Sequence, residues 1–215
     1  PAKHLYYKFY KPAGYITTCE DEKGRKTIYD ILPESLNNLK PVGRLDKDSQ
    51  GLLLLTNDGD LSNSIQKSVN NHEKEYRVRV NKPITDEFLT QMAAGVPILD
   101  TVTKKCRLYK IDNYSFKIII TQGLNRQIRR MCEYFGYKVV NLKRLRVINI
   151  RLGNLRPGEY RHLTKEEETE LRRLVERKEE VKTKREEAQP DNKNEQNVVG
   201  NKRYVSWKRE TGSKN

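Results

Sequence analysis

The feature that most constrains the fold is a run of four leucines, Leu52 to Leu55, bounded by Gly51 and Asn57. Successive residues of a strand point to opposite faces of the sheet, so a strand with one solvent-exposed face alternates between apolar and polar residues. This run is apolar at every position. It therefore predicts a strand that is buried on both of its faces.

Residues 73–80, EKEYRVRV, alternate and predict a strand with one inner and one outer face. The inner positions are Tyr76, Val78 and Val80, and the outer positions are Glu75, Arg77 and Arg79. We also expect a strand at residues 4–11 that turns at Lys-Pro-Ala-Gly into an antiparallel partner at 15–18. Further extended segments are expected at 105–111, 115–121 and 137–162.

Helices are expected within residues 57–68 and 165–188, and two further segments carry the clearest helix signals. Residues 84–95 begin with Thr85 as an N-cap and end at Gly95. Residues 125–136 place apolar side chains at i, i+3, i+4 and i+7, namely Ile128, Met131, Cys132 and Phe135. This spacing makes one apolar stripe on a helix. Because strands and helices mix without a regular β-α-β period, the fold class expected is α+β.

The charge of the chain is concentrated in its first three quarters. The formal net charge is +14, and residues 1–164 hold 29 Lys and Arg against 17 Asp and Glu. A basic body is the electrostatic signature of a polyanionic partner, because each neutralised phosphate releases counterions. Charge alone does not decide whether the partner is RNA, DNA or anionic lipid. A basic protein that is merely soluble and has no such partner is also consistent with it.

Cysteine usage and hydropathy predict a soluble protein of the cytoplasm. Cys19, Cys106 and Cys132 are odd in number and lack CxxC spacing, so neither a disulfide framework nor a zinc site is indicated. No apolar run reaches the ~18 residues of a transmembrane helix, and residues 1–10 lack the apolar core of a signal peptide.

The stretch GRLDKDSQGLLLLTNDGD, residues 43–60, crowds four aspartates around the leucine strand. Asp46, Asp48 and Gly51 match positions 1, 3 and 6 of an EF-hand loop. Position 12, which requires a bidentate glutamate, is Asn57, and positions 7 to 11 are apolar LLLLT. The sequence therefore argues against a calcium site.

Asp46 is the best candidate for a catalytic carboxylate, because it follows Leu45 and precedes the buried strand. The alternative is a turn residue that caps its loop or pairs with Arg44. On the helix at 125–136, Arg129 lies at the edge of the apolar stripe, where a half-buried guanidinium can hold an aspartate bidentately or form an ordinary surface ion pair. Tyr76 is either a core aromatic or a stacking surface for a base.

Three stretches carry a family resemblance: GRLDKDSQGLLLLTNDGDL, HEKEYRVRV and GLNRQIRRMCEYFGYKV. They occur in the order found in the RsuA/RluB/RluE/RluF family of ribosomal-RNA pseudouridine synthases, which the chain resembles over residues 3–175. KPITDEF, GVPILDTVTKKC and GLNRQIRRM look most like the RluF group.

The resemblance implies an isomerase that converts a uridine of 23S ribosomal RNA to pseudouridine without cofactor or metal. It implies a mixed, mostly antiparallel sheet in two lobes around a central cleft. Asp46 matches the essential aspartate, Tyr76 the tyrosine that stacks on the flipped uracil, and Arg129 the arginine that salt-bridges the aspartate. The expected RNA contacts are Arg44, Lys47, Asn125, Arg126, Gln127, Arg130, Lys143, Arg144 and Arg146, each weighed against an ordinary solvated charge.

The expected organisation is a catalytic domain at residues 1–180 and a basic, polar and disordered tail at 181–215. Many members of the family begin with a small S4-type RNA-binding domain, and this sequence starts almost directly at the catalytic strand, so we expect no S4 domain in it. We expect a monomer that binds RNA and no membrane. The rival function is a noncatalytic RNA-binding or ribosome-assembly factor on the same fold.

Overall fold

The computed structural model describes residues 3–18, 23–68 and 71–188 of the chain. Its strands are β1 (Tyr6–Lys11), β2 (Lys40–Pro41), β3 (Gln50–Thr56), β4 (Lys74–Val80), β5 (Pro97–Ile98), β6 (Thr101–Val102), β7 (Arg107–Asp112), β8 (Ser115–Ile120), β9 (Val139–Val147), β10 (Ile150–Arg151) and β11 (Tyr160–His162). Its α-helices are α1 (Gly59–Ser68), α2 (Asp86–Ala94), α3 (Gln127–Tyr134) and α4 (Lys165–Glu187). Two short 3-10 helices are η1 (Ile28–Asp30) and η2 (Glu34–Leu36).

One large sheet organises the molecule, with strands in the order β11-β1-β3-β9-β4-β8-β7. β2 pairs with β3 and β10 with β9, while β5 and β6 form a separate pair. Within the described residues, the pairings of the large sheet are antiparallel apart from the short parallel contact of β3 with β9. The prediction of an α+β fold with a mixed, mostly antiparallel sheet is confirmed.

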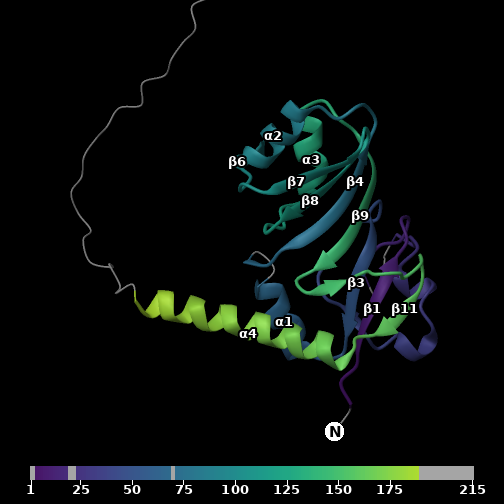
Figure 1. The fold of residues 1–215 in the computed structure, drawn as a ribbon. Helices are drawn as coiled ribbons and strands as arrows, with labels where there is room; N and C mark the ends of the chain where they lie inside the picture. The colour runs from purple at the N-terminus through teal and green to yellow at the C-terminus, as the bar shows by residue number, and fades with distance from the viewer. Residues whose placement is uncertain (1–2, 19–22, 69–70, 189–215) are drawn as a thin grey trace, which may run out of the picture.

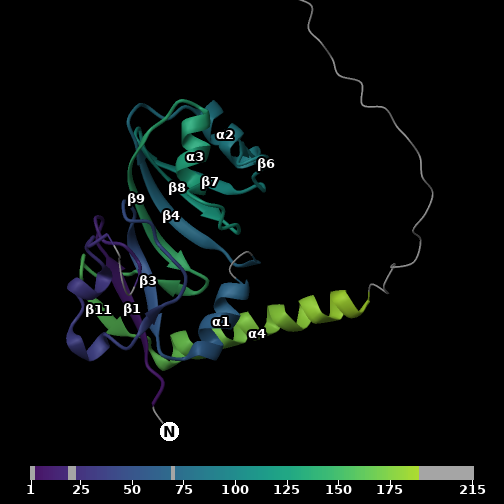
Figure 2. The same cartoon turned by 180° about the vertical axis from the view of Figure 1, so that it is seen from behind.

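The sheet is divided into two lobes (Figure 1). The β1/β3 lobe contains β1, β3 and β11 with α1 and α4, and the β4/β8 lobe contains β4, β7 and β8 with α2 and α3. β9 runs from one lobe to the other. The view from behind shows the same division, with α1 lying along the first turns of α4 (Figure 2).

The leucine run is buried on both faces, as predicted. Leu52 and Leu54 pack into an apolar cluster with α1 and α4. Leu53 and Leu55 pack on the opposite face against the segment that contains η1 and η2. All four side chains are at most 4% exposed, so β3 is the central layer of its lobe.

The two predicted helices of the β4/β8 lobe are present as α2 and α3. Thr85 caps α2, since its Oγ1 accepts a hydrogen bond of 3.1 Å from the Phe88 amide. The second helix is shorter than expected, because Arg126 adopts a left-handed conformation with φ of 48° and α3 begins only at Gln127. The predicted strands at residues 105–111 and 115–121 correspond to β7 and β8.

The predicted antiparallel partner of β1 at residues 15–18 is wrong. Ile16 makes an isolated parallel bridge with Thr27, and β1 pairs with β3 and β11 instead. The reason lies in the Lys-Pro-Ala-Gly turn, where the Gly14 amide donates a 2.7 Å hydrogen bond to the Lys47 carbonyl. This bond directs the chain toward the aspartate loop rather than back along β1.

α4 runs without interruption from Lys165 to Glu187, so the proposed domain boundary at residue 180 falls inside a helix. The part of the predicted tail beyond residue 188, and Cys19, lie outside the described residues. Among the residues that are described, no helix has the length and apolarity that crossing a membrane requires.

At Gly51 the backbone of β3 lies very close to the backbone of β9. Its φ is +111°, and a Cβ there would stand 2.3 Å from the Arg144 carbonyl oxygen. The substitution Gly51→Ala is expected to lower the free energy of unfolding by about 2 to 3 kcal/mol, because it adds both strain and a clash. Urea unfolding measures this. Gly59→Ala is the control, since no atom lies within 4 Å of its Cβ position; equal effects of the two substitutions contradict the prediction.

Candidate active site

A cavity of about 460 Å³ opens between the two lobes. The β1/β3 lobe contributes the loop at residues 42–49, Leu54 and α1, and the β4/β8 lobe contributes β4, α3 and residues 120–126. Asp46, Tyr76 and Arg129 all line it. The volume lies within the range of small-molecule pockets, ~300 to 1,000 Å³. The structure thus brings together the three residues predicted to be catalytic, which are far apart in sequence.

Asp46 stands on a loop that is fixed from its N-terminal side. The Thr17 hydroxyl donates a 2.6 Å hydrogen bond to the Leu45 carbonyl, and the Leu45 side chain is buried in the cluster under β3. The Ser49 amide closes a turn on the Asp46 carbonyl at 3.0 Å. The backbone of Asp46 is therefore held, while its side chain is 42% exposed and lines the cavity.

Lys11 fixes the same loop from beneath. Its side chain is fully buried, and its Nζ donates to the carbonyls of Ser49 at 2.8 Å, Pro12 at 2.8 Å and Lys47 at 3.4 Å. Burial lowers the pKa of Lys11 to about 8, although the negative charges of Asp48 and Asp46 oppose that shift. Lys11 is a positioning residue that the sequence analysis missed.

Arg126 connects the start of α3 to both aspartates of the loop. Its Nη1 and Nη2 donate to the two carboxylate oxygens of Asp48 at 3.0 and 2.7 Å. Its Nη1 also lies 3.6 Å from Oδ2 of Asp46. The hydrogen bonds from Arg126 hold the pKa of Asp48 below its usual value and raise the pKa of Arg126 itself.

Arg129 contacts Asp48 rather than Asp46, which corrects the expected Arg129–Asp46 salt bridge. Its Nη2 donates 2.9 Å to the Asp48 carbonyl, and its Nε lies 3.5 Å from the Asp48 carboxylate. Arg129 is buried, at 9% exposed, rather than half buried as its place at the edge of the apolar stripe predicted. Arg126 takes the place beside Asp46 because its left-handed backbone at the start of α3 sets its side chain against the loop.

Tyr76 combines the two roles that the sequence left open. Its ring packs partly against the core of the β4/β8 lobe and also lines the cavity. A register shift between Glu75 and Tyr76, where β4 pairs with β9, interrupts the ladder at this point. Such bulges change the direction of a side chain and are common beside active sites.

Lys74 and Arg144 form a buried basic wall of the cavity. Arg144 donates from Nε to the Leu52 carbonyl at 2.8 Å and from Nη1 to the Arg44 carbonyl at 3.4 Å. Burial first, and then the positive charge of Arg144, lower the pKa of Lys74 to about 8. The alternation of β4 contained the signal for Lys74, since it lies two residues before Tyr76 and therefore on the same face.

The predicted RNA contacts divide into two groups. The first group is exposed or partly exposed and consists of Arg44, Lys47, Asn125, Arg126, Arg130 and Lys143. The second group is buried or hydrogen-bonded within the protein and consists of Gln127, Arg144 and Arg146. An exposed RNA contact by Arg146 is wrong, because its guanidinium binds Glu73 at 3.0 Å and the Ile148 carbonyl at 2.7 Å. Gln127 and Arg144 face a ligand only from the cavity wall.

Glu75 is likewise buried, not on an outer face as its position in the alternation predicted. It is 7% exposed, and its carboxylate lies 3.5 Å from Arg151 and 4.0 Å from Arg146. Pairing with arginines from β9 and β10 explains how a charged residue is accommodated there. Within the described residues, no cluster of His, Cys, Asp and Glu suited to a metal ion is present.

The lowered pKa of Lys11 predicts a pH dependence of stability. Between pH 8 and 10.5 the unfolded chain keeps the Lys11 proton and the folded chain releases it, so this group makes stability rise with pH. Lys11→Met is expected to remove up to about 1.4 kcal/mol per pH unit of that rise. Urea unfolding at pH 7, 8, 9 and 10 measures it, with the exposed Lys26→Met as control. Parallel curves for the wild type and Lys11→Met contradict the prediction.

Comparison with known proteins places this geometry in a family. A family model described as RNA pseudouridylate synthase matches residues 6–134. A protein of Salmonella typhi named dual-specificity RNA pseudouridine synthase RluF is 55% identical over 77% of the chain and 57% of its own length. The protein of that name from Escherichia coli O6:H1 is 50% identical over 95% of the chain and 68% of its own length.

A solved structure titled "Crystal structure of pseudouridylate synthase" superposes with a TM-score of 0.72 at 33% identity, over 79% of this chain and 74% of that one. The chain spans 57% of the Salmonella relative's length. The family match covers the aspartate loop, β4 and α3, which are the segments that carry Asp46, Tyr76 and Arg129. This chain therefore belongs to the RNA pseudouridylate synthase family.

Proposed function

We propose that this protein converts a specific uridine of 23S ribosomal RNA to pseudouridine, with Asp46 as the nucleophile, in the cytoplasm and as a monomer. The observation that carries the proposal is the meeting of Asp46, Tyr76 and two arginines at one cavity between the lobes. The RluF relatives and the family match support the same reaction.

In the proposed reaction each of these residues has a part. The uridine leaves its stack, at a cost of a few kcal/mol, and enters the cavity, where the Tyr76 ring stacks on the base. Arg126, whose Nη1 lies 3.6 Å from Oδ2 of Asp46, orients that carboxylate within the cavity. Asp46 then attacks C1′ or otherwise assists cleavage of the bond between N1 and C1′.

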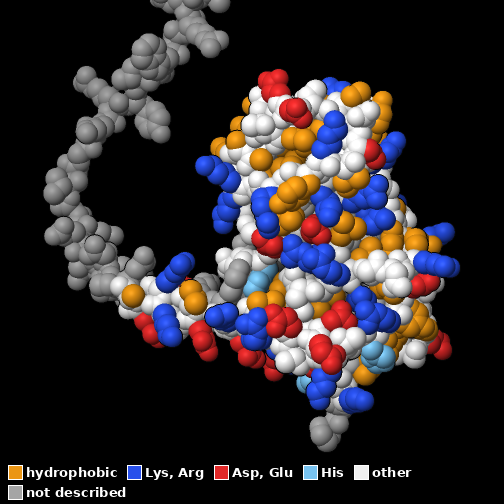
Figure 3. All heavy atoms as spheres, viewed as in Figure 1, with side chains coloured by type: hydrophobic (Ala, Val, Ile, Leu, Met, Phe, Trp, Pro, Cys, Tyr) orange, Lys and Arg blue, Asp and Glu red, His pale blue; other side chains and the backbone are white. Residues whose placement is uncertain are grey.

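The rearrangement needs no added atoms. The freed uracil turns within the cavity, and C5 bonds to C1′ as any bond between Asp46 and C1′ breaks and restores the carboxylate. The C5 hydrogen leaves as a proton, and N1 gains one. Lys74 and Arg144 lie on the cavity wall and supply positive charge beside the displaced base. The exposed arginines and lysines seen on both lobes in Figure 3 are suited to the surrounding phosphates.

Tritium release from RNA labelled at uracil C5 tests the reaction, because that hydrogen is lost when pseudouridine forms. Asp46→Asn is expected to lower the rate by roughly 10³-fold or more while RNA binding and folding persist. Asp60→Asn, on exposed α1, is the matched control. Labelled 23S rRNA and a labelled tRNA pool are compared, with mock reactions that lack the enzyme, to define the substrate.

Either of two outcomes overturns this assignment. Near-normal release by Asp46→Asn removes Asp46 as the nucleophile. Tight binding of 23S rRNA by the wild type, with no release from either RNA, favours the noncatalytic RNA-binding factor. Light scattering of the free protein checks the monomer.

Arg129 is expected to act through the loop that it supports. Arg129→Lys loses the planar group that reaches both the carbonyl and the carboxylate of Asp48, so kcat is expected to fall roughly 10- to 100-fold with KM little changed. Arg130→Lys is the control on the same helix, since Arg130 bonds to Asn125 at the surface. Equal kcat values for the two variants contradict this role.

A further inference from the structure

The second half of α4 leaves the body of the protein. Leu171 and Val175 are each 1% exposed and belong to the core of the β1/β3 lobe. Beyond Val175, each side chain whose burial the structure describes is exposed. Figures 1 and 2 both show the helix continuing past α1 into solvent. Residues 176–187 form this outer segment, which is about 18 Å long at ~1.5 Å per residue.

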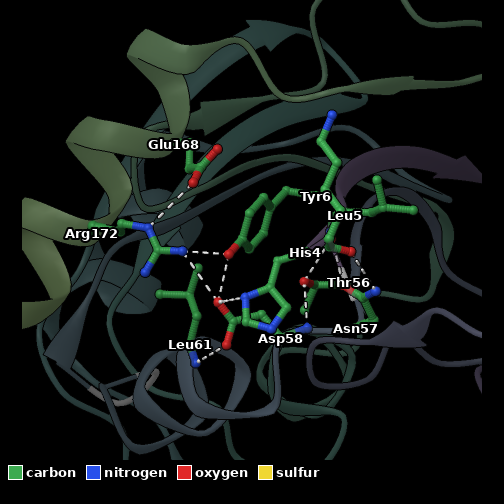
Figure 4. A network of polar contacts seen from close by, with 10 residues as sticks. His4, Leu5, Tyr6, Thr56, Asn57, Asp58, Leu61, Glu168 and Arg172 are labelled. Atoms are coloured by element: carbon green, nitrogen blue, oxygen red, sulfur yellow. Dashed lines mark hydrogen bonds and ion pairs between the residues drawn. The ribbon is translucent and has the colours of Figure 1, made fainter. Parts of the chain in front are cut away.

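A polar network anchors the first half of α4 and so fixes the direction of the outer segment (Figure 4). Arg172 donates to the Tyr6 hydroxyl and, at 3.2 Å, to the Asp58 carboxylate. Tyr6 donates to the same carboxylate at 2.5 Å, and the Asp58 Oδ1 accepts from the Leu61 amide at the start of α1 at 3.1 Å. The network thus ties α4 to β1 and α1.

The outer segment separates its charges by face. At 100° per residue, the basic residues Arg177, Lys184 and Arg185 fall in one sector of about 100°, with Val181 within it. Among the side chains that the structure describes, the acidic residues fall in a separate sector of about 120°; they are Glu176, Glu180, Glu186 and Glu187. In Figure 3 acidic side chains gather along the lower edge of α4. The helix therefore presents one basic face.

The first half of α4 lies on the same side of the β1/β3 lobe as the cavity. Ile65 of α1 packs in the same core as Leu171 and Val175, and Ile65 and Gln66 line the cavity. Leu54 of β3 also belongs to both the cavity wall and this core. α4 is thus on the face of the β1/β3 lobe that carries the cavity, with α1 between them.

The chemistry of the outer segment favours a polyanion over other partners. Among its described side chains, Val181 is the exposed large apolar one, at 48%. A second copy of the chain or a protein groove requires an apolar stripe along such a helix, as does a membrane surface. A short, polar helix is also marginally stable in water alone, and a bound anionic partner holds it in place.

We propose that the basic face of the outer segment is an RNA-binding arm, in which Arg177, Lys184 and Arg185 contact phosphates of the RNA that flanks the modified uridine. The inference rests on the proposed function, because it takes that RNA as the partner. RNA whose base occupies the cavity passes over α1 and continues along α4.

Salt-dependent binding of the full chain tests the arm. The triple variant R177Q/K184Q/R185Q and the wild type are titrated by filter binding against an unmodified in vitro transcript of 23S rRNA, at 50 to 200 mM KCl. Each lost phosphate contact lowers the slope of log K against log salt by ~0.7 to 0.9. The slope is expected to fall by about 2 to 3, and affinity at 100 mM KCl by roughly tenfold or more.

Two control variants separate the arm from net charge and from helix stability. K23Q/K26Q/K40Q removes the same charge from exposed residues beside the η1 and η2 segment, on the opposite face of β3 from α4. E176Q/E180Q/E187Q changes the acidic sector of the same helix and is expected not to lower the slope. Circular dichroism checks that glutamine, a good helix former, preserves α4 in each variant.

The outcomes distinguish this proposal from the proposed function. If R177Q/K184Q/R185Q shows the slope of K23Q/K26Q/K40Q, the arm is disproved, and tritium release by the wild type still supports the isomerase. If the wild type releases no tritium, and the salt slope falls for R177Q/K184Q/R185Q but for neither control variant, the RNA-binding arm is supported and the proposed reaction is not. With both proposals correct, the arm variant raises KM for the transcript at least fivefold and leaves kcat unchanged.

Discussion

The short parallel contact between β3 and β9 is the constraint on which the rest of the structure depends. It pairs Gln50 with Lys143 and Gly51 with Arg144, and it joins the two lobes of the sheet. The backbones approach so closely at Gly51 that a side chain does not fit there. Asp46 precedes this contact by only four residues, so the position of the aspartate loop follows directly from the junction of the lobes.

The aspartate loop is held largely by cations that the protein has buried. Lys11, Arg129 and Arg144 are at most 9% exposed, and each donates to backbone carbonyls of the loop or of β3. Burying a charge is costly unless hydrogen bonds satisfy it. Carbonyl oxygens provide this here, and Asp46 and Asp48 add opposite charge. Part of the basic excess is therefore structural, and only the remainder is available to RNA.

Local patterns predicted the fold well where one physical rule dominated. The leucines of β3, the Thr85 cap and the apolar stripe of α3 each reflect a local preference that the tertiary structure did not override. Apart from the partner strand wrongly predicted at residues 15–18, the main errors concern charged residues. Lys74, Glu75 and Arg146 were expected at the surface or passed over, because charge usually means exposure. Arg146 of β9, for example, pairs with Glu73 and Glu75, which flank the start of β4, and a pattern within one segment carries no information about such partners. The sequence analysis expected Arg129 beside Asp46, whereas Arg126 lies there. The left-handed backbone of Arg126 at the start of α3 is not visible in the helical pattern of the segment.

The residues of the site come from both lobes. The geometry of the site therefore depends on the contacts that join the lobes. Asp46 comes from the β1/β3 lobe, whereas Tyr76, Arg126 and Arg129 come from the β4/β8 lobe. The bonds from both arginines to Asp48 cross between the lobes and add to the short β3–β9 pairing. A base that enters the cavity is therefore enclosed by the same interactions that hold the lobes together. Mutations at the junction are therefore expected to shift the position of Asp46, even when they change no residue that lines the cavity.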